Sequence, residues 1–198
     1  MTAVIIAYPP SGGGNHLKNM LCLDSSFGNS DDLDIGVYTQ GKREVHSTSG
    51  RNVSAERIAT AANDPHHEYI IHGHFGELAT QRDAINAIVD KKFVILTIDT
   101  SRDRYLLNNR QGRLGQMSHE YYLNEEQPYL YQPVFYQTYF TGLAQNIYTI
   151  SINEFWHPDL DQYKIIQGLN SFLNKNVEQS QAQFLHNHWH KNNQIDYY

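Results

Sequence analysis

The feature that most constrains the fold is an apolar run that leads through a glycine-rich turn into a helical pattern. Residues 3–8 read AVIIAY, which is typical of a buried strand, and the turn and the first helical residue follow as Pro9, Pro10, Ser11, Gly12, Gly13, Gly14 and Asn15. In this order the backbone amides of the turn can converge on one point, where the helix adds about half a positive charge. The stretch from Pro10 to Asn15 is therefore predicted to bind a phosphate- or sulfate-bearing ligand. The alternative is a strand-to-helix turn in which the glycines only relieve crowding.

The turn lacks two groups that bind Mg-nucleoside triphosphates in a P-loop. Such loops read GxxxxGK[ST], with a Lys for the outer phosphates and a hydroxyl for Mg²⁺. Here Asn15 and His16 follow Gly14, and Pro9 stands at the first glycine position. The sequence therefore argues against ordinary ATP or GTP hydrolysis by this loop.

Size and composition predict one soluble, cytoplasmic domain covering residues 1–198. The 15 basic and 21 acidic residues give a net charge of −6, which disfavours bulk attraction to nucleic acid or to an anionic membrane. The single cysteine, Cys22, excludes an internal disulfide and a cysteine-based zinc site, and a buried place on the first helix is expected for it. We see neither a secretory signal pattern nor an apolar run long enough to span a bilayer.

Apolar runs and helical spacings alternate along the chain. Strands are expected at 3–8, 69–75, 92–98 and 147–152, and helices at 15–23, 54–63, 81–90, 161–173 and 177–190. The segment 24–54 is interpreted as a loop with at most one short element, of a length that suggests a lid, and the Arg-rich stretch from 102 is expected to begin as a helix. This alternation predicts an α/β fold with a mainly parallel sheet flanked by helices.

Ligands of parallel sheets bind beyond the carboxyl ends of the strands, where three polar segments should meet. These are the glycine turn, the end of the strand that carries His72 and His74, and the segment after Ile98. Since His72 lies deeper in its strand, we interpret it as a buried core residue. For His74, at the strand end, the sequence leaves open a core role and a role as a base that accepts a proton from a substrate hydroxyl.

Four segments together resemble the sulfotransferase family in order along most of the chain. AYPPSGGGNHL resembles the family loop YPKSGTTWL, which binds the 5′-phosphosulfate of 3′-phosphoadenosine 5′-phosphosulfate, and IIHGHFGEL resembles the strand end KTHLP with its catalytic His. VILTIDTSRDRYLLNN occupies the place of VVRDPRDVLVS. ISINEFWHPDLDQYKIIQGLNSFLN is similar to a family strand and helix with an acidic residue, here Glu154. The resemblance implies a three-layer sandwich of the P-loop NTPase or sulfotransferase type, with His74 as the catalytic base.

The chain departs from the family pattern where the family places cations. Pro10 stands where the family has the Lys that stabilises charge on the bridging oxygen of the donor, and Asp99 where it has an Arg for the 3′-phosphate. Gly13 and Gly14 replace two Thr, Leu107 replaces a Ser, and the later Arg-Asp pair is kept as Arg102 and Asp103. A developing charge without a matched cation forfeits about 3 kcal/mol of transition-state stabilisation.

Two functions of different class follow. The first is sulfuryl transfer from 3′-phosphoadenosine 5′-phosphosulfate to a small-molecule or glycan hydroxyl, without a metal, in which His74 is catalytic and Lys18 or Arg102 replaces the missing cation. Arg102 and Arg110 are the arginines expected to bind donor oxygens, the alternative being a solvated helix face. The second is a nucleotide- or anion-binding module that has lost catalysis, which the replacements at Pro10 and Asp99 favour. A small-molecule or nucleoside kinase is a third reading, against which the missing Walker residues argue.

Two further groups of side chains suggest sites less directly. His186 and His190 share a helix face, which invites a metal, but no third ligand is near in sequence, so a solvent-exposed tail is the preferred interpretation. Several tyrosines suggest an acceptor pocket, although ordinary packing explains them equally well; they are Tyr121, Tyr122, Tyr129, Tyr131, Tyr136 and Tyr139.

Overall fold

The structure is a computed structural model. It describes residues 2–24, 26–27, 44–46, 58–59, 63, 68–114, 131–143, 146–193 and 197, and for 2, 44–46 and 111–114 it describes the backbone alone. Most of the expected lid at 24–54, most of the expected helix at 54–63, and Tyr121, Tyr122 and Tyr129 lie outside these residues.

The described strands form one parallel sheet with β1 (Thr2–Ala7) at its centre. The order is β2 (Glu44–His46), β3 (Tyr69–Gly73), β1, β4 (Asp90–Thr97) and β5 (Ile147–Ser151), and each pair of neighbours is parallel. Residues 3–7 are fully or almost fully buried. This explains the continuous apolar run, because a central parallel strand is covered on both faces.

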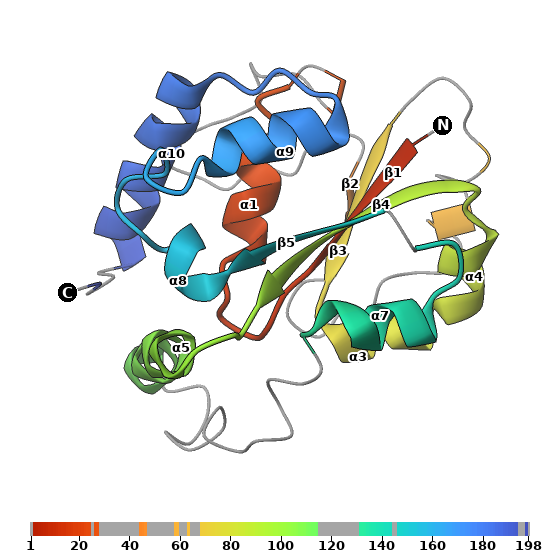
Figure 1. Ribbon diagram of the computed structural model, residues 1–198, viewed down its shortest axis with the longest axis horizontal. Helices are drawn as coiled ribbons and strands as arrows, with labels where there is room; N and C mark the ends of the chain where they lie inside the picture. Colours follow the sequence, from red (N-terminus) through yellow and green to blue (C-terminus); the bar gives the residue numbers. More distant parts are fainter. Residues whose placement is uncertain are drawn as a thin grey trace.

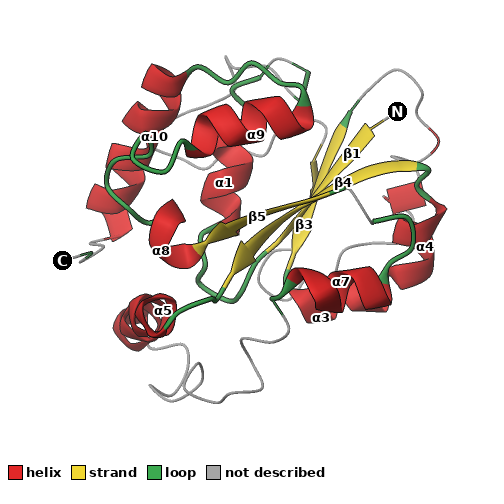
Figure 2. Cartoon of the chain, viewed as in Figure 1, coloured by secondary structure: helices red, strands yellow, loops and turns green. Residues whose placement is uncertain are grey.

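Helices cover both faces of the sheet, so the fold is an α/β sandwich (Figures 1 and 2). One face carries α1 (Gly14–Leu21), α9 (Ile165–Leu173) and α10 (Gln179–Asn193), and the other carries α3 (Phe75–Thr80), α4 (Arg82–Ala87) and α7 (Pro133–Tyr139). α5 (Ser101–Leu114) and the short α8 (Ile152–Phe155) lie together beyond the carboxyl ends of the strands. Among the described residues, no helix is both long and apolar enough to cross a membrane.

The chain leaves the neighbouring strands β1 and β3 towards opposite faces of the sheet. After β1 it enters α1 on one face, and after β3 it enters α3 on the other (Figure 1). Such a divergence between adjacent parallel strands leaves a crevice at their carboxyl ends, which is the usual ligand position in open α/β sheets. The glycine turn and His74 flank this position.

The expected strands are confirmed, whereas several helix boundaries were wrong. The helix expected at 81–90 is α4, which ends at Ala87, and Asp90 already belongs to β4. The sequence did not predict α3, which begins at Phe75, where the strand expected at 69–75 was to end. Ile152 starts α8 instead of ending β5, because Ser151 and Glu154 form a capping box: the Glu154 amide donates to the Ser151 hydroxyl and the Ser151 amide to the Glu154 carboxylate. Cys22 is buried, as expected.

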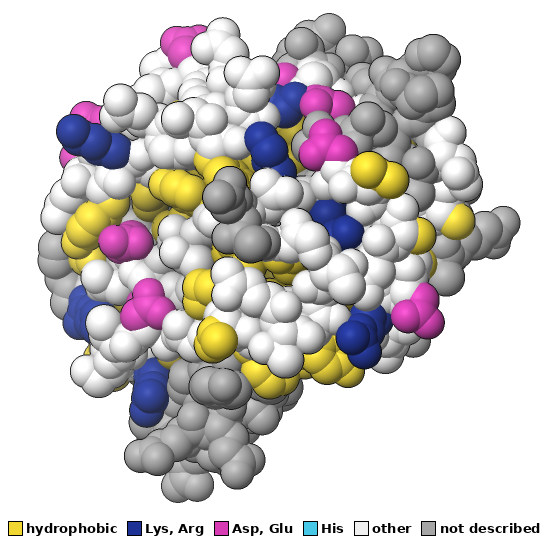
Figure 3. Space-filling model, turned by 45° about the vertical axis from the view of Figure 1, so that its right-hand side comes forward, with side chains coloured by type: hydrophobic (Ala, Val, Ile, Leu, Met, Phe, Trp, Pro, Cys, Tyr) yellow, Lys and Arg dark blue, Asp and Glu magenta, His cyan; other side chains and the backbone are white. Residues whose placement is uncertain are grey.

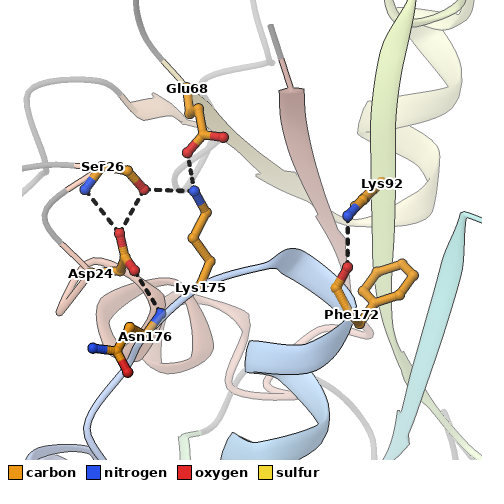
Figure 4. A network of polar contacts seen from close by, with 7 residues as sticks. All are labelled: Asp24, Ser26, Glu68, Lys92, Phe172, Lys175 and Asn176. Carbon is orange, nitrogen blue, oxygen red and sulfur yellow. Dashed lines mark hydrogen bonds and ion pairs between the residues drawn. The ribbon is translucent and has the colours of Figure 1, made fainter.

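A polar network joins the C-terminal end of α1 to the start of β3 and to the α9–α10 connection (Figure 4). Lys175 pairs with Glu68 and donates to the Ser26 hydroxyl at 2.7 Å, and Asp24 accepts from the amides of Ser26 and Asn176 at 2.9 and 2.8 Å. Although burial opposes it, the Ser26 and Asn176 hydrogen bonds and the Lys175 charge lower the pKa of Asp24. These contacts lie at the edge of the sheet away from the glycine turn, so they support the fold and not the site.

A buried carboxylate, Asp103, ties α5 to the ends of two strands. It is 0% exposed and accepts hydrogen bonds from the amides of Asp99 (3.0 Å) and Thr100 (2.7 Å), from the Thr100 hydroxyl (2.8 Å) and from the amide of Asn153 in α8. Among side chains of this length, only an Asp carboxylate offers two acceptor oxygens and no donor, so it can accept all of these hydrogen bonds. Asp103 therefore fixes the segments that follow β4 and β5.

We expect Asp103→Ala to lower the free energy of unfolding by about 3 kcal/mol, because it leaves several buried amides without an acceptor. For a chain of this size that corresponds to a loss of roughly 6 to 12 °C in Tm. The control is Asp83→Ala, at an exposed position in the first turn of α4, for which a change below about 1 kcal/mol is expected. Equal losses in the two variants, measured by urea denaturation, would contradict this role of Asp103.

Candidate functional site

The turn between β1 and α1 has a backbone of alternating hand. Ser11 has a φ of 63° and Gly13 a φ of 91°, both left-handed, while Gly12 between them is not. Successive residues of alternating hand make a concave run of N–H groups, the arrangement called a nest, which binds anions. Glycine at position 13 permits this conformation, because a side chain there would strain the backbone.

Two side chains from distant elements hold the carbonyl groups of the turn. Arg110 in α5 donates from Nη1 to the Ser11 carbonyl at 2.6 Å, and Trp156 donates from Nε1 to the Gly12 carbonyl at 3.0 Å. Because a trans peptide directs its N–H opposite to its C=O, the Gly13 amide points away from Trp156. The carbonyls thus face the protein, and the Gly13 amide is directed to the other side.

Four consecutive amides at the start of α1 have no acceptor among the described residues. The Gly12 amide donates to the Pro9 carbonyl at 2.8 Å, and the Leu17 amide donates to Gly13 at 3.0 Å. The amides of Gly13, Gly14, Asn15 and His16 take part in no hydrogen bond to the described part of the chain. Such amides carry the positive end of the helix dipole, so this is where an oxyanion would be stabilised.

His74 lies beside the beginning of the turn because of strand register. Ala7 pairs with Gly73, so the next residues, Tyr8 and His74, emerge side by side. His74 Nδ1 lies 3.0 Å from the Tyr8 carbonyl oxygen, and the two rings meet edge to face with centroids 4.8 Å apart. Since a carbonyl can only accept, Nδ1 carries the proton, and Nε2 of the neutral ring is left with the lone pair that a general base needs.

Tyr8 joins the helix N-terminus to His72 of β3 and to His74, the residue that follows β3. Its ring packs so closely against Gly14 that a Cβ there would lie 2.0 Å from Tyr8 Cδ1. Its hydroxyl lies 3.3 Å from Nδ1 of His72, which is 0% exposed. The interpretation of His72 as a buried core residue is therefore confirmed, while Tyr8 was not predicted as part of the site.

The other predicted site residues are placed as follows. Arg110 reaches the turn, where it contacts the Ser11 carbonyl, and it also donates to Asn193 at 2.8 Å. Arg102 lies over the rings of Tyr105 and Tyr197, so its recorded contacts are not with the turn. Lys18 is one turn into α1 and only 3% exposed, and Pro10 is half-buried at the head of the turn.

Asp99 occupies the carboxyl end of β4, beside β1. Its carboxylate accepts from the Thr97 hydroxyl at 2.7 Å and from Gln132 Nε2 at 3.0 Å. A carboxylate therefore lies at the rim where the family resemblance implies an arginine for a 3′-phosphate. An anionic group placed next to Asp99 would be repelled by it.

The expectation of a solvent-exposed C-terminal tail was wrong for His186. This side chain is 0% exposed, and its Nδ1 lies 3.0 Å from Nε2 of His16, the third residue of α1. The ring of Trp189 stacks on His16 with centroids 4.5 Å apart and also closes over Gly13. Sequence reasoning missed these contacts because 170 residues separate the two histidines.

Of the tyrosines that suggested an acceptor pocket, the structure describes three. Tyr136 packs on Phe75, the residue after His74, with centroids 5.4 Å apart, and Tyr139 packs on the same ring at 5.3 Å. Burial raises the pKa of Tyr136 well above its usual value, and Tyr131 adds to this effect. These two tyrosines therefore pack on the residue that follows His74, Tyr136 within the core and Tyr139 partly buried against it.

In the described segments, no group of three or more His, Cys, Asp or Glu side chains is arranged to hold a metal ion. Charged side chains of both signs are interspersed on the face shown in Figure 3. Comparison of the chain with protein-family models, with curated proteins and with solved structures gives no match. The α/β fold and the geometry of the site are thus the basis for a functional proposal.

We expect Gly14→Ala to destabilise the protein by about 1 to 3 kcal/mol through the clash with the Tyr8 ring. The sign of the change in stability is informative, because without the clash Ala would stabilise a helix by about 1 kcal/mol relative to Gly. Gly76→Ala in α3 is the matched control, since a Cβ there has no neighbour within 4 Å, and this variant should be neutral or more stable. Thermal unfolding of both variants measures the difference; a stabilised Gly14→Ala would show that Tyr8 does not pack against the turn.

Proposed function

We propose that the protein is a sulfotransferase-like enzyme that binds the phosphosulfate end of 3′-phosphoadenosine 5′-phosphosulfate at the turn from Pro10 to Asn15. His74 then takes the proton of a small-molecule or glycan hydroxyl. The observation that carries this proposal is that Tyr8 contacts both groups. Its ring packs on Gly14, one of the amides that have no acceptor among the described residues, and its carbonyl holds Nδ1 of the His74 imidazole.

The roles follow from what each group can do. His74 Nε2 accepts the hydroxyl proton as the acceptor oxygen forms its bond to sulfur. The bond from sulfur to the bridging oxygen breaks, and 3′-phosphoadenosine 5′-phosphate leaves. The amides of Gly13 to His16 and the α1 dipole stabilise the negative charge that develops on the departing phosphate. Arg110 acts indirectly, because its bond to the Ser11 carbonyl keeps the turn in shape.

A second candidate is a binding module without catalysis. It is favoured because the described side chains near the turn do not place a cation where the bridging oxygen of the donor would lie. Pro10 has neither a side-chain donor nor an N–H. Lys18 is buried, and the recorded donors of Arg110 serve Ser11 and Asn193. Such a site would hold the anionic end of a nucleotide without the cation that assists its departure.

We expect 3′-phosphoadenosine 5′-phosphate to raise the Tm selectively in a thermal-shift panel that also contains ATP with Mg²⁺, and sulfate against chloride at equal ionic strength. At a hundredfold its Kd, a ligand adds about 2.7 kcal/mol, which is roughly 5 to 10 °C here. A shift with ATP only in the presence of Mg²⁺ would indicate a kinase. No shift with any of these ligands would remove the proposal.

Under the first candidate, His74→Ala should lower sulfuryl transfer to phenolic, aliphatic and glycan hydroxyls by at least about 100-fold, because a general base contributes that much. The nucleotide Kd should stay unchanged. His188→Ala on α10, whose recorded ring contact is with Phe184, is the control. Nucleotide binding without transfer in the wild-type protein would establish the binding module, and unchanged transfer in His74→Ala would exclude His74 as the base.

A further inference from the structure

A buried hydrogen bond between two histidines connects the first turn of α1 to α10. His186 Nε2 lies 2.8 Å from the His157 carbonyl oxygen, which can only accept, so Nε2 carries a proton. In the neutral ring Nδ1 is then an acceptor, and at 3.0 Å it receives the proton of His16 Nε2. The bond thus requires a neutral His186, because a second proton on His186 would face the N–H of His16. For His16 itself, burial disfavours a charged ring.

The surroundings of this pair offer no compensation for added charge. His16 is 2% exposed and His186 0%, and the rings of Phe155 and Trp189 pack against both. Among the described residues, the charged or titratable groups that act on the pair are Arg110 from α5, His157 after α8 and His190 from α10. All of these are cationic when charged, so each disfavours a proton on the pair.

The same helix also supports the anion-binding turn from behind. Trp189 lies against Gly13, where a Cβ would be 3.0 Å from its ring. Arg110 holds the Ser11 carbonyl and the Asn193 side chain of α10 at once, between the rings of Trp156 and Trp189. Departure of α10 would therefore remove Trp189 from the turn and one of the two anchors of Arg110.

We propose that the His16–His186 contact is a proton-sensitive joint that holds α10 against the anion-binding turn, and that mild acid releases α10 and loosens the turn while the sheet stays folded. Acid favours release because both rings are neutral while α10 is docked. Once α10 leaves, both imidazoles reach water and take up protons near pH 6.5, so acid favours the released form.

The electrostatics of the pair agree in sign. Burial, and then the charges of His186, His190 and Arg110, lower the pKa of His16 well below 6.5. Burial, and then His190, lowers the pKa of His186 to about 3, and burial lowers that of His190 to about 4. A pKa that is lower in the docked form means that docking is fully stable above about pH 6.5 and weakens as the pH falls towards these values.

Hydrogen exchange at pH 7.5 and 5.5, corrected for intrinsic rates, tests the joint in the wild-type protein. For each histidine that is neutral when docked and free at pKa 6.5, the released fraction should rise about 10-fold between these pH values, and hence about 100-fold for the pair. His190 adds about another 10-fold, so the protection of α10 should fall about 1000-fold in all. At both pH values α10 should exchange faster than β1, because β1 opens only when the whole sheet unfolds. Fluorescence reports the same event, because the protein has two tryptophans, Trp156 and Trp189, and both contact Arg110.

The double variant H16F/H186F keeps ring packing and removes both titrating groups, which is the change least disruptive to a buried polar pair. It should lose the 100-fold change of the pair and keep only the contribution of His190, about 10-fold. H188F on the same helix is the control and should behave as the wild type does. Exchange of α10 as slow as that of β1 in the wild type would mean that α10 opens only by global unfolding. That result, or an unchanged pH response in a folded double variant, would overturn the joint.

An experiment with added nucleotide separates this inference from the proposed function. Only this experiment rests on the proposed function. By reciprocity, 3′-phosphoadenosine 5′-phosphate bound at the turn should slow α10 exchange at pH 5.5. If the pH response is present and the nucleotide has no effect, the joint stands and the nucleotide site fails. If the nucleotide slows exchange but α10 shows no pH response, the site stands and the joint is excluded.

Discussion

The parallel pairing of β1 with β3 on one side and β4 on the other is the constraint on which the rest of the structure depends. It buries β1 on both faces, and its register brings Tyr8 and His74 out of the sheet side by side. Because the chain then leaves β1 and β3 towards opposite faces, these residues lie at the carboxyl edge where open α/β sheets bind ligands. The short distance between His74 and the Tyr8 carbonyl is thus a consequence of strand register.

The turn between β1 and α1 depends for its conformation on distant side chains as much as on its own residues. Glycine at position 13 permits the left-handed backbone, but Arg110 and Trp156 decide which way the carbonyls face. Both side chains belong to elements that follow the ends of β4 and β5, and the buried carboxylate of Asp103 fixes those same segments. The orientation of the amides therefore depends on packing at the carboxyl edge of the whole sheet.

The dependence on α10 gives the site a physical link to the C-terminal part of the chain. The His16 amide has no acceptor in the described part of the chain, and the His16 ring is the partner of a buried histidine on α10. A hydrogen bond between neutral imidazoles in an apolar setting is a specific contact that protons oppose. His16 thus contributes both to the N-terminus of α1 and to the contact with α10, and protonation of its partner opposes that contact.

The sequence by itself determined the order of the strands along the chain, the turn after β1 and the place of His74, because apolar runs and glycine act locally and parallel strands share one carboxyl edge. It missed α3 and misjudged the exposure of His186, because a helix of six residues is too short to show a clear period and a contact across 170 residues shows none. Tertiary structure alone decided the roles of Tyr8, Trp156 and Trp189. The physical reason is that hydrogen bonds and ring contacts between distant elements depend on sheet register and helix docking, which local pattern does not encode.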